Sequence, residues 1–224
     1  EIIIEDKQSK ERPDSGDDKE KVKKDIHKKN IEETPPTILK FNNETIKAAV
    51  KDWLADESIA EAKYGHISNW DTTEVTDMNK LFLDAHTFNE PLNNWDVSKV
   101  TNMHAMFDNA YVFNQPLNNW DVSKVTDMSE MFSSMESLAF NQPLNNWDVS
   151  SVLDMSAMFD HAEAFNQPIG SWDVSKVTNM QNMFCGAKAF NQPIGDWDVS
   201  SVIDMQNMFF QSAFNQPIGN WDVS

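Results

Sequence analysis

Apolar and polar positions recur along most of the chain with a nearly constant period. Tryptophan returns at intervals of 24 to 27 residues, and the same run of residue types follows each of these tryptophans. Six complete units and the start of a seventh are present. A fixed period of this length predicts a solenoid, in which each unit forms one coil and stacks on the next. The repeated tryptophans are Trp70, Trp95, Trp120, Trp147, Trp172, Trp197 and Trp221.

Two periodicities lie within each unit. Apolar and polar residues alternate over 95–98, which is the spacing of a β-strand whose tryptophan faces inward. A second stretch has apolar residues at i, i+3, i+4 and i+7, which is one face of a short helix. We therefore predict an α/β repeat over 69–224: a right-handed solenoid with one short parallel strand and one short helix per coil. In the second unit the apolar positions of the predicted helix are Met103, Met106, Phe107 and Ala110.

The units differ in length only between the predicted helix and the next Phe-Asn-Gln-Pro. Phe132 and Phe140 are eight residues apart, whereas Phe107 and Phe113 are six apart. Changes in length are tolerated in surface loops, so this stretch is predicted to be a loop on one edge of the stack.

Residues 41–68 are predicted to form a helical cap on the first coil, because the exposed end of a stack needs a cover with a polar outer face. The pattern predicts a break near Asp56, a capping box formed by Ser58 and Glu61, and a helix end at Gly65. The helical spacing is carried by Ile46, Ala49, Val50, Trp53 and Leu54.

Residues 1–40 have a different composition. They hold 11 acidic and 10 basic residues, interleaved, and no aromatic residue. So polar a segment buries too little surface to offset its ordering entropy, which predicts a charged flexible tether. The alternative is a single exposed helix near residues 18–32.

Composition excludes several classes of function. The chain has 18 basic and 36 acidic residues and a formal net charge of −18, which argues against binding of nucleic acid. Residues 41–224 hold 8 basic and 25 acidic residues, so the acidity belongs to the repeats and their cap. A single cysteine excludes an intrachain disulfide framework. No apolar run is long enough for a transmembrane segment.

A row of aspartates is the candidate ligand-binding face. Parallel strands would place these carboxylates about 4.8 Å apart, so their mutual repulsion needs compensation. Hydrogen bonds from hydroxyl and backbone groups, a cation such as calcium or a basic partner, and raised pKa values are the three explanations that stay open. The aspartates are Asp71, Asp96, Asp121, Asp148, Asp173, Asp198 and Asp222. The serines beside them are Ser98, Ser123, Ser150, Ser175 and Ser200.

Other repeated residue types are predicted to be structural. Eleven of the 12 methionines occupy two positions on the apolar face, so they and the tryptophans are expected in the core. The asparagine of each Phe-Asn-Gln-Pro is expected to satisfy backbone groups at turns. The five histidines share no repeat position, so no zinc site is expected. Cys185 occupies a variable position and is expected to be partly exposed, with no partner that would make it a nucleophile.

The repeat resembles that of a known family. The spacing Leu92-x-x-Trp95-x-Val97 resembles the strand pattern of leucine-rich repeats. The run Trp-Asp-Val-Ser-Lys-Val-Thr-Asp-Met-x-x-Met-Phe, followed by Phe-Asn-Gln-Pro, resembles the BspA-type leucine-rich-repeat bacterial surface proteins over residues 43–224. The resemblance implies a leucine-rich-repeat-like fold in a secreted or surface-anchored protein, lipid-anchored before processing. It also implies a non-enzymatic role in binding host or neighbouring molecules.

These observations together predict an extracellular or cell-surface scaffold for adhesion or protein–protein interaction, with an extracellular or host protein as partner and no catalytic residues. A uniform ladder lacks the two acids in unlike environments that glycoside hydrolysis requires. The alternatives are a face that binds divalent cations or another repeated ligand, and a purely structural spacer. The last coil has no visible cover, which predicts self-association through it.

Overall fold

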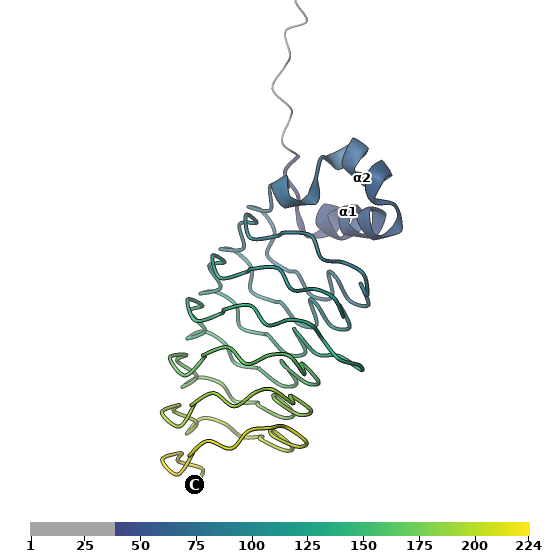
Figure 1. Cartoon of the computed structure of the whole chain (residues 1–224). Coiled ribbons are helices and arrows are strands. Elements are labelled where there is room, and N and C mark those ends of the chain that lie inside the picture. Colours follow the sequence, from purple (N-terminus) through teal and green to yellow (C-terminus); the bar gives the residue numbers. More distant parts are fainter. Residues whose placement is uncertain (1–38) are drawn as a thin grey trace, which may run out of the picture. The chain divides into compact units, whose positions relative to one another are not determined.

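A computed structural model describes residues 39–224, which belong to one compact unit. The predicted tether, 1–40, therefore lies almost wholly outside the described residues. Figure 1 shows a pair of helices at one end of the unit, followed by a stack of coils that runs to the C-terminus. Successive coils lie one below the other, in the order of the sequence.

The predicted α/β solenoid is wrong. The described residues form two α-helices, α1 (Asn43–Ala55) and α2 (Glu57–Tyr64), one 3-10 helix, η1 (Ile67–Asn69), and no strand or sheet. The coils themselves consist of turns and irregular segments. Single-residue parallel bridges are the only β-type pairing among the described residues. These bridges join Lys40 to Asp71, and then Asp77, Asn102, Asp127, Asp154, Asn179 and Asp204 in series.

The Trp-Asp-Val segment forms no strand because turns close on both sides of it. The backbone N–H of Trp95 donates to the carbonyl of Leu92 at 3.0 Å, and that of Val100 donates to Val97 at 2.8 Å. These groups are therefore used within their own coil. The alternation itself is real, since Trp95 and Val97 are buried and Asp96 is exposed. Three residues between two turns are too few to build a ladder.

The predicted helix in each coil is replaced by a series of turns. In the second coil Ala105 and Asn109 have φ of 51° and 58°, a left-handed conformation that cannot continue a right-handed helix. Alternate N–H groups then point to the next coil, where they donate to its carbonyls at 2.8–3.0 Å. The N–H groups between them close turns within the coil, as Met106 does with Met103 at 3.2 Å. The inter-coil donors are Met103, Ala105, Phe107 and Asn109.

The core consists of aromatic columns that run along the stack. Each complete coil contributes two phenylalanines whose rings lie 4.0–4.2 Å apart between centroids. Each phenylalanine also stacks on its counterpart in the next coil, as Phe107 does on Phe132 at 5.6 Å and Phe113 on Phe140 at 6.1 Å. Ten of the eleven repeated methionines are buried, as predicted, and Met205 is partly buried against this core. The repeated tryptophans are buried as well, except that Trp221 is partly buried.

The two helices follow the predicted pattern, except in the capping of α2 and at Leu54. Asp56 separates α1 from α2, and Gly65, with φ of 75°, ends α2. The predicted capping box of Ser58 and Glu61 is wrong: the N-cap of α2 is Asp56, whose side chain accepts from the N–H of Ile59 at 3.0 Å. Leu54 is exposed, while the other predicted apolar positions, Ile46, Ala49, Val50 and Trp53, are buried.

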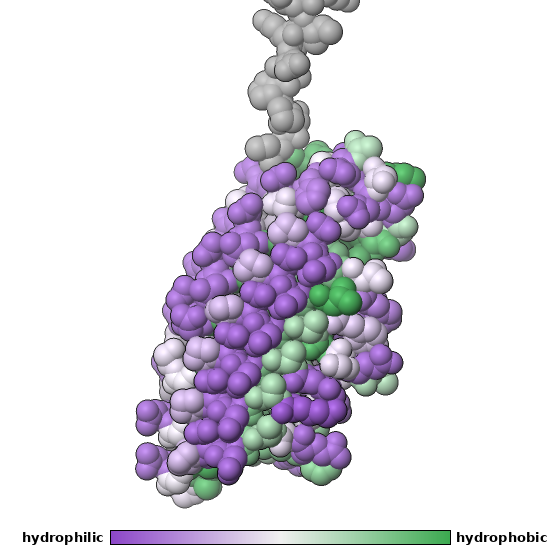
Figure 2. Space-filling view, viewed as in Figure 1, coloured by the Kyte–Doolittle hydropathy of each residue, from purple (hydrophilic) through white to green (hydrophobic). Residues whose placement is uncertain are grey.

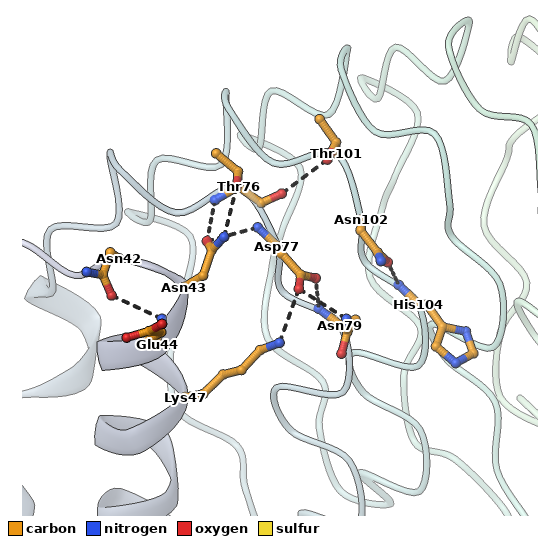
Figure 3. Close-up of polar contacts among 10 residues, drawn as sticks. All are labelled: Asn42, Asn43, Glu44, Lys47, Thr76, Asp77, Asn79, Thr101, Asn102 and His104. Carbon is orange, nitrogen blue, oxygen red and sulfur yellow. Dashed lines mark hydrogen bonds and ion pairs between the residues drawn. The ribbon is translucent and has the colours of Figure 1, made fainter.

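Helix α1 supplies the first coil with the hydrogen bonds that a preceding coil supplies elsewhere. In later coils a backbone carbonyl accepts from the threonine of the next coil, as Thr76 accepts from the N–H of Thr101 at 2.9 Å. At the first coil the side-chain Oδ1 of Asn43 accepts from the N–H of Thr76 at 2.8 Å, and its Nδ2 donates to Thr76 Oγ1 at 2.9 Å. Figure 3 shows this junction, with Lys47 paired to Asp77 beside it.

Asn43→Ala is expected to lower the free energy of unfolding by about 1–2 kcal/mol. The variant removes the acceptor of Thr76, and each lost hydrogen bond costs about 1 kcal/mol. Urea unfolding of the full chain measures the change. Lys51→Ala, at an exposed position of the same helix, is the control and is expected to be within about 0.5 kcal/mol of the parent. Equal effects of the two substitutions would contradict this role of Asn43.

Candidate functional site

Each aspartate of the predicted row is held by the residue two positions later. The N–H of Ser123 donates to Asp121 Oδ1 at 3.1 Å, and its hydroxyl donates to the same oxygen at 2.6 Å. Asp173, Asp198 and Asp222 are bound in the same way by Ser175, Ser200 and Ser224, and Asp71 by Thr73. Ser98 and Ser150 donate through their N–H groups to Asp96 and Asp148.

These bonds support hydrogen bonding as the explanation for the row and exclude raised pKa values. Hydrogen bonds from the hydroxyl and then the backbone N–H lower the pKa of Asp71, Asp96, Asp121, Asp173, Asp198 and Asp222. Raised pKa values are therefore wrong for these six residues. The stability that the bonds add is present above the ordinary pKa of aspartate and is lost as pH falls through the lowered value.

A second row of the same turns was missed by the sequence analysis. The N–H of Ser129 donates to Asp127 Oδ1 at 3.0 Å, and that of Gln181 donates to Asn179 Oδ1 at 3.1 Å. The row holds four acids and two amides, and Asn179 Nδ2 donates to Asp154 Oδ2 of the preceding coil at 3.1 Å. The signal in the sequence is an Asp or Asn at one repeat position. The row is Asp77, Asn102, Asp127, Asp154, Asn179 and Asp204.

The asparagines of Phe-Asn-Gln-Pro are structural, as predicted. The Oδ1 atom of Asn114 accepts from the N–H of Asn141 in the next coil at 3.0 Å, and Gln142 Nε2 donates to the carbonyl of Asn114 at 3.0 Å. The tryptophans are also satisfied within the core: Trp147 Nε1 donates to the carbonyl of Leu117 at 3.0 Å. Among the described residues, no buried side-chain nitrogen or oxygen lacks a hydrogen-bond partner, so these ladders satisfy the polar side chains inside the stack.

Four exposed or partly exposed side chains that do not repeat lie along the edge where the loop is predicted. We call the cluster formed by His86, Tyr111, Val112 and Met135 the loop edge. The rings of His86 and Tyr111 stack with centroids 4.5 Å apart. Val112 and Met135 are 45% and 84% exposed, and Met135 lies within the two-residue insertion of the third unit. The N–H of Met135 donates to Asn109 Oδ1 at 2.8 Å, which fixes the insertion to the coil above.

Three side chains with metal-ligand atoms converge elsewhere in the stack. The ligand atoms of Asp160, His161 and Cys185 all lie within 4.8 Å of one another, and none of the three is fully buried. Among residues 39–224 this is the one such group of three, and no member of the aspartate row belongs to it. Burial and a hydrogen bond with Asp160 raise the pKa of the Cys185 thiol to about 11. The thiol is therefore a poor nucleophile at neutral pH.

A carboxyl group with a raised pKa lies near the loop edge. Burial, followed by the nearby charges of Glu130 and Asp84, raises the pKa of Asp108 to about 6, while Ser133 and His104 act in the opposite direction. The folded state therefore binds this proton more tightly than the unfolded state does. The contribution of Asp108 to stability is therefore highest at low pH and is lost as pH rises from 3.8 to about 6.

Asp108→Asn is expected to stabilise the chain at pH 7 by about 1 kcal/mol and to leave it unchanged at pH 4. A shift of about two pKa units corresponds to about 3 kcal/mol, which partial exposure of the group reduces. Unfolding by urea at both pH values measures the difference. A difference between variant and parent that does not depend on pH would contradict the assignment.

Among the described residues, no helix is both long and apolar enough to cross a membrane.

The chain matches one known protein family. No curated protein and no solved structure matches the chain. Two overlapping matches to a single family cover residues 53–170 and 134–224, and so include α2 and every coil. The chain therefore belongs to the family described as Mycoplasma protein of unknown function, DUF285.

Proposed function

We propose that this chain is a surface-exposed or secreted repeat scaffold that binds another protein and has no catalytic role. The observation that carries the proposal is the loop edge. Repeated residues fill the core and the ladders, whereas the loop edge holds non-repeated apolar and aromatic side chains, among them the stacked rings of His86 and Tyr111. Aromatic residues and Met are enriched at protein interfaces. A pure spacer has no need of such a cluster.

The aspartate row supports a partner with basic residues. Each turn uses Oδ1 of its aspartate, and among residues 39–224 no protein group donates to the Oδ2 atoms of the row. One carboxylate oxygen per coil thus stays available, at the same place in successive coils. Figure 2 shows one face of the coils, on which hydrophilic side chains cover broad areas and a narrower hydrophobic band runs along the stack. Complementary charge on a partner would speed association.

The resemblance of the repeat to BspA-type surface proteins supports a place outside the cell. A ladder for divalent cations has less support, because calcium takes six to eight oxygen ligands and the row offers single carboxylates. Self-association through the last coil stays a prediction. Its apolar residues Val202, Met205, Phe209 and Trp221 are partly buried, and sedimentation at high concentration tests it.

The experiment compares two double variants of the full chain. Val112→Ser with Met135→Ser removes the exposed apolar groups of the loop edge. Leu153→Ser with Ile203→Ser is the matched control, because these side chains are also exposed apolar groups, 47% and 87%, at a different repeat position. Each protein is tested for saturable binding to an array of immobilised extracellular and host-surface proteins.

Saturable binding that the loop-edge variant weakens at least about tenfold, and the control variant does not, is the expected result. Equal binding by all three proteins would overturn the loop edge as the contact surface. If the parent binds nothing on the array, the spacer function replaces the scaffold function.

A further inference from the structure

We propose that Asp160, His161 and Cys185 form a binding site for a zinc-type divalent cation, which joins two successive coils. This inference is independent of the proposed binding of a protein partner. Asp160 and His161 lie in the fourth coil and Cys185 lies in the fifth. Their ligand atoms lie within 4.8 Å of one another, and His161 Nδ1 is 2.7 Å from Asp160 Oδ1.

The stacking of the coils holds the three residues together. Asp160 and Cys185 occupy the same repeat position, directly after the buried phenylalanine, so they lie in neighbouring coils of one column. The N–H of His161 donates to the carbonyl of Cys185 at 2.7 Å, which belongs to the inter-coil ladder. The backbone of the fourth coil is therefore fixed against that of the fifth at the site itself.

Gly186 provides the space in which the His161 ring lies. A Cβ atom at Gly186 would lie 2.8 Å from His161 Cδ2 and 3.0 Å from Nε2. Its φ of 66° does not by itself require glycine, because Asn109 and Gln211 have φ of 58° and 57° at the same repeat position. The ring of the neighbouring histidine is what excludes a side chain there. Glycine at this position thus places the imidazole beside Cys185 and Asp160.

The donor set selects the class of cation. A bound cation displaces the proton of the Cys185 thiol, and the resulting set of one thiolate sulfur, one imidazole nitrogen and one carboxylate oxygen suits zinc and similar borderline metals. Calcium and magnesium prefer oxygen ligands throughout, and only one is offered. Three protein ligands leave a fourth position for water or another molecule. The side chains of Asp160 and His161 are 23% and 39% exposed, which gives the cation a route from solvent.

Each substitution introduces a residue type that occurs at the equivalent repeat position of another coil. Cys185→Ser follows Ser133, His161→Gln follows Gln211, and Gly186→Asn follows Asn109. The first two remove ligands, and the third keeps the backbone but fills the space of the imidazole. His104→Gln is the control, because His104 Nδ1 contacts Ser129 Oγ at 2.9 Å and lies outside the cluster.

Calorimetric titration of the full chain with zinc chloride alone tests the proposal. We expect one zinc ion per chain. Affinity should fall by more than about tenfold in Cys185→Ser and His161→Gln, by about tenfold or more in Gly186→Asn, and not in His104→Gln. With cobalt(II) as the probe, the parent should show a thiolate-to-metal charge-transfer band that Cys185→Ser lacks.

Thermal unfolding without metal shows that each variant folds, so that loss of binding is not loss of structure. The site is overturned if the parent binds no zinc. It is equally overturned if folded Cys185→Ser and His161→Gln bind zinc as the parent does, or if cobalt bound to the parent shows no thiolate band.

Discussion

Trp147→Ala is expected to lower the free energy of unfolding by about 3–5 kcal/mol, and Trp221→Ala by clearly less. Trp147 is 4% exposed, its indole N–H donates to the carbonyl of Leu117, and its ring lies 6.4 Å from that of Phe132. Trp221 makes the corresponding bond to Ile194 but is only partly buried. In a stack of repeats each unit gains stability from its neighbours on both sides.

Urea unfolding of both variants, followed by the fluorescence of the remaining tryptophans, gives the two free energies. Each variant removes one tryptophan from the same repeat position, so each serves as the matched control of the other. Equal destabilisation would contradict a stability built from contacts between neighbouring coils.

Phe159→Ala is expected to cost about 3–5 kcal/mol as well, because Phe159 stacks in two directions. Its ring lies 4.0 Å from Phe165 in the same coil and 5.7 Å and 5.6 Å from Phe132 and Phe184 in the adjacent coils. Truncation would leave a cavity at the crossing of these columns. The neighbouring side chains are fixed by their own stacking, so we expect little collapse into the space.

The matched control is Phe210→Ala, one residue beyond the same column in the sixth coil. Phe210 is 56% exposed, so its truncation is expected to change stability by less than about 1 kcal/mol. Urea unfolding under the same conditions measures both. A cost at Phe159 no larger than at Phe210 would show that ring stacking between coils is not what holds the core together.

Much of the arrangement of side chains could be predicted from the repeat alone. The tryptophan, methionine and asparagine columns were assigned to the core and to turns from their fixed spacing, and the structure places them there. The inward and outward alternation at Trp95, Asp96 and Val97 was also correct. Identical residues at the same repeat position have the same environment in every coil, so an assignment made for one coil holds for the others.

The site was less predictable. The pairing of each aspartate with the serine or threonine two positions later is local, and the hydrogen bonds that were one of three explanations for the row are present. The cluster of Asp160, His161 and Cys185 was not predicted, because histidines that share no repeat position give no sign of a metal site in the sequence. The ligands come from different positions in neighbouring coils, and only the offset between coils brings them together.

The sequence by itself determined that this protein is a stack of repeated units with a helical cap, and which side of each unit faces the core. Only the tertiary structure decided the backbone. The spacing of apolar residues shows which side of a segment is buried, but it is compatible with both a helix and a series of turns. Residues with a left-handed backbone conformation, such as Ala105 and Asn109, direct alternate N–H groups toward the next coil. A helix would close these hydrogen bonds within one coil. Here they join neighbouring coils, so each bond also stabilises the stack.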